Sequence, residues 1–98
     1  MRVLRQGDVV LREVNLSLKE YDHYRCGDEI VIEGETGHSH VMRGVSVYQM
    51  QGQTYVVVEK PSVMTHEEHR PLIVPPGVYE VTRVRDFQGM RRIGMSID

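Results

Sequence analysis

Hydrophobic and polar residues alternate along the chain in short runs, and glycine, proline or other turn-forming residues separate these runs. Such runs predict β-strands, because successive side chains of a strand point to opposite faces of its sheet. No stretch carries apolar residues at helical spacing over three turns, and the polar segment 15–28 reads as a loop with room for one helical turn. The strands are expected at 8–14, 29–33, 38–43, 45–50, 54–59, 62–66, 72–74, 78–87 and 93–97.

Turn signals divide these strands at regular intervals. Gly44 is expected to end one strand before the next begins, and Gln51-Gly52-Gln53 is expected to connect the two strands of a hairpin. Many short strands with regular glycine and proline turns are typical of β-sandwiches and small barrels. A chain of 98 residues builds one hydrophobic core. We therefore predict an all-β protein, a single domain over residues 1–98 folded as a small β-barrel or jelly-roll-like sandwich.

The composition is that of an ordinary folded domain, since 40% of the residues are hydrophobic and 27% are charged. A net charge of -2 gives no general attraction to nucleic acid or to an anionic membrane. No apolar run is long enough for a signal peptide or a membrane span. We expect a cytoplasmic protein without a membrane partner. Cys26 is the single cysteine, which excludes a disulfide within the chain.

Four of the five histidines lie in two short segments, 38–40 and 66–69. Strand alternation predicts that the two histidines of the first segment face the same way, with Ser39 turned from them. The second segment is expected at a strand end and turn, because Arg70-Pro71 follows it at once. Imidazole is the commonest transition-metal ligand, and a metal site needs three or four ligands that converge from different segments. The predicted metal ligands are His38, His40, His66 and His69.

Acidic residues flank the second histidine segment and extend the possible chemistry. Glu67 and Glu68 are the predicted catalytic residues, as general bases toward a metal-bound water, or they orient an imidazole by accepting its second N–H. Such a ligand set suits a divalent transition metal, and Zn, Fe, Mn and Ni all remain open. The alternative is that both segments are solvated turns whose histidines and glutamates form ordinary charge pairs.

Two further functions stay open. Apolar strand faces in so short a chain would suit a homo-oligomeric structural or assembly module, and we expect a homo-oligomer that also takes a small-molecule ligand. RNA or single-stranded DNA could contact an arginine-rich C-terminal face with interleaved aromatic residues, although Glu80 and Asp86 balance this face and we expect no nucleic acid partner. The residues of that face are Arg83, Arg85, Arg91, Arg92, Tyr79 and Phe87.

A His-x-His pair on an early strand and a later Pro-x-Gly turn resemble the cupins, small jelly-roll barrels that usually hold a metal. His38 and His40 match the paired histidines, and 75–77 matches the Pro-x-Gly turn. Gly44 and Val45 stand where the cupin pattern has glutamate, and Glu80 stands where it has its last histidine. The resemblance implies a β-barrel more than it implies the cupin ligands.

Four motifs together resemble an uncharacterised group of small prokaryotic proteins and domains. These motifs are Gln-Gly-Asp-Val at 6–9, Glu-Gly-Glu-Thr-Gly-His-Ser-His at 33–40, His-Glu-Glu-His-Arg-Pro at 66–71 and Pro-Pro-Gly-Val-Tyr-Glu-Val at 75–81. The resemblance spans most of the chain. It implies that the two histidine segments belong together, and it implies no activity.

Overall fold

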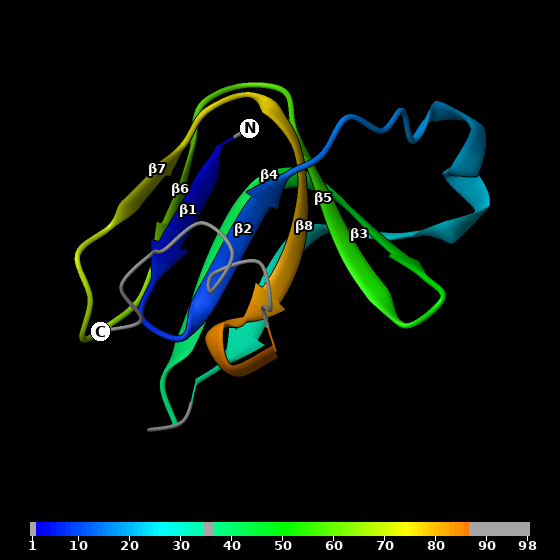
Figure 1. The fold of residues 1–98 in the computed structure, drawn as a ribbon. Coiled ribbons are helices and arrows are strands. Elements are labelled where there is room, and N and C mark those ends of the chain that lie inside the picture. Colours follow the sequence, from blue (N-terminus) through cyan, green and yellow to red (C-terminus); the bar gives the residue numbers. More distant parts are fainter. Residues whose placement is uncertain (1, 35–36, 87–98) are drawn as a thin grey trace.

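The computed structural model describes residues 2–34 and 37–86, and nearly all of its regular structure is antiparallel β-strand. Figure 1 shows the elements in chain order. They are β1 (Val3–Gln6), β2 (Val9–Glu13), the 3-10 helix η1 (Lys19–Tyr24), β3 (Arg25–Glu33), β4 (Ser39–Met50), β5 (Gln53–Val58), β6 (Ser62–Thr65), β7 (Leu72–Val74), β8 (Gly77–Arg83) and the 3-10 turn η2 (Val84–Asp86).

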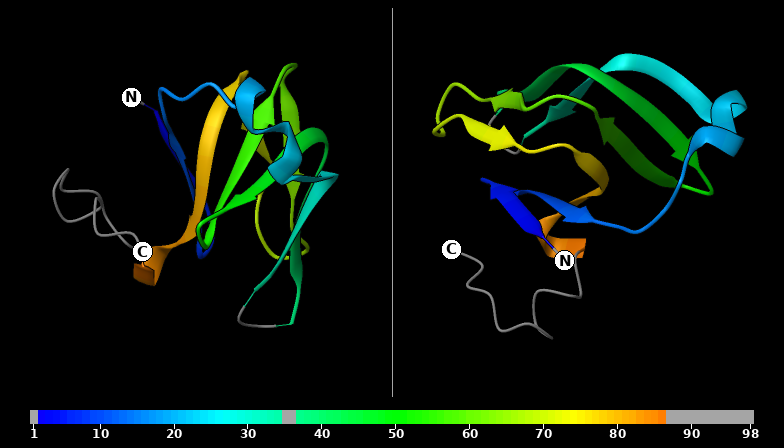
Figure 2. Two further views of the ribbon diagram at one scale, coloured as in Figure 1. Left: turned by 90° about the vertical axis from the view of Figure 1, so that its right-hand side faces the viewer. Right: turned by 90° about the horizontal axis from the view of Figure 1, so that it is seen from above.

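The strands form one sheet that curls into a nearly closed barrel. Its order is β1-β2-β8-β5-β4-β6-β7, and β3 pairs with β4 beside this path. Seen from above, the strands curve around a common interior (Figure 2). β1 comes close to β7 at the end of the path, where no strand pairing of the described residues joins them. The predicted all-β barrel is thus confirmed.

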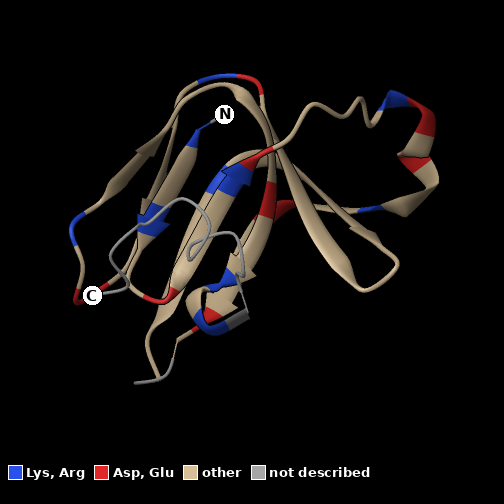
Figure 3. Ribbon diagram, in the orientation of Figure 1, with Lys and Arg blue, Asp and Glu red and all other residues tan. Residues whose placement is uncertain are grey.

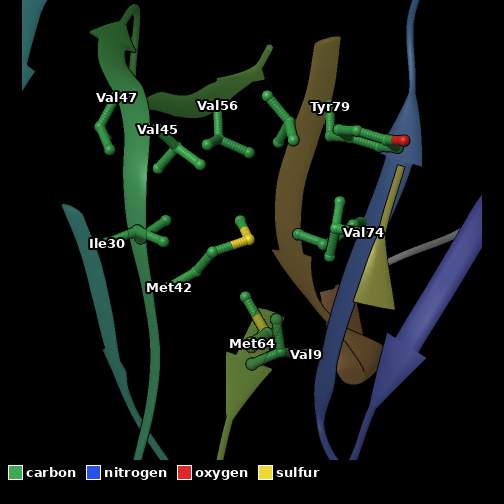
Figure 4. Packing of buried hydrophobic residues seen from close by; sticks show 11 residues of the cluster. Val9, Ile30, Met42, Val45, Val47, Val56, Met64, Val74 and Tyr79 are labelled. Atoms are coloured by element: carbon green, nitrogen blue, oxygen red, sulfur yellow. The ribbon is translucent and has the colours of Figure 1, made fainter. Parts of the chain in front are cut away.

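The interior is filled by aliphatic side chains and one tyrosine. Figure 4 shows this core, to which β2, β3, β4, β5, β6, β7 and β8 all contribute. Met42, Met64 and Val56 have no exposed surface, and Tyr79 is also fully buried. The Tyr79 hydroxyl donates a 2.6 Å hydrogen bond to the carbonyl oxygen of Pro75, so its polar end is satisfied inside the fold.

Several expected boundaries are wrong. Gly44 does not end a strand: β4 runs through it, and its φ of 75° places a left-handed residue inside a strand that pairs with β6 before it and with β5 after it. β3 begins at Arg25, inside the expected loop, and Val3–Gln6 is a strand that the sequence did not predict.

Other expectations hold, hold in part or lie outside the described part. The expected helical turn in 15–28 is η1, which Figure 1 shows standing away from the barrel. The strand expected at 78–87 is wrong at its C-terminal end, because β8 ends at Arg83 and η2 follows. The strand expected at 93–97 lies outside the described residues, as do Glu35 and Thr36 of the glycine turn.

Candidate functional site

The turn between β1 and β2 carries two polar side chains into one end of the barrel. Gln6 ends β1 and Asp8 precedes β2, and the chain reverses between them at Gly7, whose φ is 58°. The Arg5 Nε–H donates a 2.7 Å hydrogen bond to the Gly7 carbonyl oxygen and fixes the turn. A Cβ at Gly7 would overlap the His69 ring, so glycine is required here both for its φ and for space.

The side chain of Gln6 is buried, and its contacts determine which way its amide points. Its Nε2 donates to the carbonyl oxygens of Met64 at 2.9 Å and Arg70 at 2.8 Å. The reverse orientation would set the amide oxygen against two carbonyl oxygens, so the Oε1 atom must face the other way. Gln6 thereby bridges β1 to the β6–β7 hairpin across the gap where β1 and β7 are not paired in the described part of the sheet.

His40, near the start of β4, has no exposed surface and places both ring nitrogens against oxygen atoms. Its Nδ1 lies 2.9 Å from Gln6 Oε1, and its Nε2 lies 3.0 Å from Asp8 Oδ1. Because Gln6 Oε1 can only accept, the Nδ1 atom of His40 must carry a proton. The tautomer of the neutral ring is then set, and its Nε2 lone pair faces the carboxylate of Asp8.

Asp8 is held as a carboxylate on its other side. Arg83, at the end of β8, donates from Nη1 to Asp8 Oδ2 at 2.7 Å, and its Nη2 donates to the carbonyl oxygen of Glu33. Partial burial raises the pKa of Asp8, but the hydrogen bond and charge of a protonated His40, a backbone hydrogen bond and the charge of Arg83 outweigh it, so the pKa lies below its ordinary value.

The surroundings of His40 oppose a positive charge on its ring. Burial lowers its pKa below the ordinary histidine value, and the neighbouring His66 and His69 lower it further, while the hydrogen bond and charge of Asp8 act in the opposite direction. A positive charge between His40 Nε2 and Asp8 would stabilise this geometry. A proton on Nε2 would supply it, but the resulting imidazolium is disfavoured by burial.

The two histidine segments meet in space. The His66 ring lies 4.3 Å from the His40 ring and 5.9 Å from the His38 ring, measured between centroids. The His69 ring lies 4.5 Å from the His66 ring and stacks over His40 at 6.1 Å. The contact that the sequence suggested between segments 38–40 and 66–69 is therefore present, and His66 lies between both histidines of the first segment.

Gly34 provides the space in which two of these rings approach each other. A Cβ at Gly34 would lie 3.5 Å from His66 Nε2 and 3.7 Å from His40 Nε2, and only 2.9 Å from the His38 carbonyl oxygen. The Nε2 atoms of the two rings thus point toward one small region. His66 Nδ1 accepts the backbone N–H of Glu68 at 3.0 Å, so the neutral His66 ring carries its proton on Nε2.

His38 takes a different position from His40, although both rings contact His66. It precedes β4 and is about one-third exposed, with Nδ1 at 2.8 Å from Glu67 Oε2 and Nε2 at 3.6 Å from Glu68 Oε1. Glu67 and Glu68 are exposed, and both approach the His38 ring. Their catalytic role stays a prediction.

The described part of the chain contains no group of three or more His, Cys, Asp or Glu side chains whose positions could hold a metal ion. The four rings form a chain of contacts, in which oxygen atoms face both ring nitrogens of His40 and the Nε2 of His66 carries the proton. The metal-ligand roles of His38, His40, His66 and His69 also stay predictions.

The arginine-rich face differs from the one expected. Tyr79 is fully buried and cannot stack on a base, Arg83 is turned to Asp8, and Arg85 follows the end of the strand in η2. Figure 3 shows basic and acidic residues interspersed over the described strands. Phe87 and the arginines at 91–92 lie outside the described residues.

Two other surface features concern expected partners. Val63 and Ile73 are cross-strand neighbours on β6 and β7, and their exposed fractions are 47% and 65%. A homo-oligomer stays a prediction. Among the described residues, no helix has the length and apolar character needed to cross a membrane.

One comparison with known proteins identifies the family. The family described as "Domain of unknown function (DUF8820)" matches residues 5–84, which is most of the chain, so the chain belongs to this family. The match includes both histidine segments, Gln6, Asp8 and Arg83. No curated protein and no solved structure matches the chain, and none of these comparisons supports the cupin resemblance.

Sequence reasoning missed three residues of this site. Gln6 and Asp8 belong to the Gln-Gly-Asp-Val motif, from which no site role is predicted, and Arg83 is expected on a nucleic acid face. The motif could have pointed to them, because a Gly-Asp turn does not require a glutamine before it and Gln6 therefore needs another explanation. Their distance from the histidines along the chain hid the connection.

Proposed function

We propose that the chain is a metal-binding protein whose ion lies between His40 Nε2 and the carboxylate of Asp8, with His66 and His69 as further ligands. His38, the remaining predicted ligand, lies at the edge of this centre and pairs with Glu67. The centre differs from the ligand set expected from sequence in two ways, because Asp8 joins it and His38 does not.

The observation that carries this proposal is the hydrogen bonding of His40. Both ring nitrogens face oxygen atoms that can only accept, since Gln6 is fixed by two carbonyl groups and Asp8 by Arg83. A lone pair on Nε2 facing an ionised carboxylate is repulsive unless a positive centre lies between them. A metal ion supplies that centre while the buried imidazole stays neutral.

The separation of these two donor atoms suits a metal. Transition-metal bonds to imidazole nitrogen and carboxylate oxygen are about 2.0–2.2 Å long. Two adjacent ligands of an octahedral ion at about 2.1 Å are about 2.1 × √2, or about 3.0 Å, apart. His40 Nε2 and Asp8 Oδ1 are 3.0 Å apart. The bond from His40 Nδ1 to the Gln6 oxygen is the outer interaction that metal-bound histidines commonly make.

The tautomer of His66 explains why a third donor is not in place without metal. Its Nδ1 accepts the Glu68 N–H, so Nε2 is protonated and cannot donate a lone pair. Ligation by Nε2 requires the proton to leave that nitrogen and the bond to the Glu68 N–H to break. Binding is therefore expected to reorganise the turn at 66–69. The mixed nitrogen and oxygen donors suit Zn, Fe, Mn or Ni.

Calorimetric titration of chelator-treated protein with each of these ions tests the proposal. We expect one ion per chain for at least one metal, and a loss of at least about tenfold in affinity for Asp8→Asn. Asp28→Asn is the matched control, because Asp28 is an exposed aspartate on β3, and it should bind like the native protein. An Asp8→Asn variant that bound as tightly as the control would overturn the proposal, as would native protein that bound none of the four ions.

A further inference from the structure

A groove of about 360 Å³ opens beside β3, and no histidine is among its described lining residues. β3 pairs with β4 along one edge, and its other edge pairs with no described strand. The groove lies between β3 and the β5–β8 part of the sheet, and it is open to solvent on one side. Its volume falls in the range of small-molecule sites.

About half of the residues that line this groove are apolar. Ile30, Ile32, Val47 and Val81 are among its walls, together with Val31, and the polar residues Thr54, Thr82 and Gln49 also line it. Such a surface favours a ligand with a short hydrocarbon part, since removing apolar area from water is favourable.

The charged residues that line the groove determine which charged group of a ligand would fit there. Arg83 is the one basic residue among the described residues that line it. Both charged lining residues have an ion-pair partner, since Glu29 pairs with Arg43 at 3.0 Å and Arg83 with Asp8 at 2.7 Å. The bonds of Arg83 to Asp8 and to the Glu33 carbonyl hold its guanidinium in place and engage two of its five N–H donors. An oriented guanidinium with further donors is suited to a carboxylate.

We propose that this groove binds a small organic carboxylate, with its apolar chain along β3 and its carboxylate at Arg83. The ligand would lie next to the Asp8–His40 pair, separated from it by the Arg83 guanidinium. The binding does not require a metal ion, so the groove and the metal centre can be tested separately.

Titrating hexanoate into chelator-treated, isotope-labelled protein and following backbone amide resonances tests the groove. We expect saturable shifts at Ile30, Ile32 and Val81, with affinity at least about tenfold higher than for acetate because methylene groups are buried. Hexylammonium, which has the same chain and the opposite charge, should leave these resonances unmoved.

Three variants locate the site. Thr54→Phe places a ring into the groove, whereas Val57→Phe places the same ring on the outer face of the same strand. Hexanoate binding should be lost in Thr54→Phe and kept in Val57→Phe, and Arg83→Lys should weaken it at least about tenfold while thermal denaturation shows that the variant is folded.

Three results would overturn the proposal. They are equal binding of hexanoate and hexylammonium, hexanoate binding that survives Thr54→Phe, and the lack of any saturable shift in the native protein. None of these results depends on whether metal binds at Asp8, so failure here is distinct from failure of the metal proposal.

Discussion

Replacing Gln6 by methionine removes the hydrogen bonds of this residue while keeping nearly the same volume. Gln6 is buried, with 4% of its surface exposed, and its amide satisfies three groups: the Met64 and Arg70 carbonyl oxygens and the His40 Nδ1–H. Methionine is flexible and can fill the same space, so the change tests polar contacts rather than packing.

The expected loss of stability follows from the groups left without partners. A buried donor or acceptor without a partner costs about 1–3 kcal/mol. The bonds to Met64 and His40 are buried, whereas the bond to Arg70 is only partly buried and water can replace it. Two such groups give a loss of about 2–6 kcal/mol. A domain of this size has a total stability of about 5–15 kcal/mol, so Gln6→Met should be severely destabilised.

Urea denaturation of the metal-free protein measures this loss directly. The matched control is Gln53→Met at the exposed start of β5, which should change the free energy of unfolding by less than about 0.5 kcal/mol. If Gln6→Met were no less stable than Gln53→Met, the amide would not satisfy these groups and the assigned tautomer of His40 would lose its basis.

Three further predictions concern the surroundings of the site. Gly7→Ala should lower the free energy of unfolding by about 1–3 kcal/mol or more, since its φ of 58° disfavours a side chain and the new Cβ would overlap His69; urea denaturation measures this. The pKa values of His40 and Asp8 lie below their ordinary values, so the unfolded chain binds protons more readily and the metal-free protein should lose stability as the pH falls below about 6.5; a melting temperature that rose on acidification would contradict this. Tyr79→Phe removes a 2.6 Å hydrogen bond to a backbone carbonyl oxygen and should cost about 1 kcal/mol, measured by thermal denaturation.

The strand pattern could be predicted because alternation and turn residues act locally. The hairpin at Gln51-Gly52 and the position of the second histidine segment after β6 are of this kind. Gly44 could not be read correctly, because a glycine at positive φ has the same local signature whether it ends a strand or bends one. Pairing with two partners, β6 and β5, decides that β4 continues, and that pairing is a property of the whole sheet.

The candidate site could be predicted only in part. The two histidine segments were found because four rings are concentrated in them, and the structure shows that they meet. The roles of Gln6 and Asp8 depend on barrel closure, which brings the β1–β2 turn to His40 across more than thirty residues of chain. Burial also separates His40 from His38, and alternation alone assigned the two rings the same environment.

The central claim is that a metal ion takes the position between His40 Nε2 and Asp8 Oδ1. The most direct test is a nitrogen-15 NMR spectrum of the histidine rings, recorded on chelator-treated protein and again after saturation with zinc. We predict that the Nδ1 of His40 stays protonated throughout and that its Nε2 resonance moves on addition of one equivalent of zinc, in the native protein but not in Asp8→Asn. A His40 Nε2 that carries a proton in the presence of excess zinc would contradict the claim, because a proton and not a metal ion would then lie between Nε2 and Asp8 Oδ1.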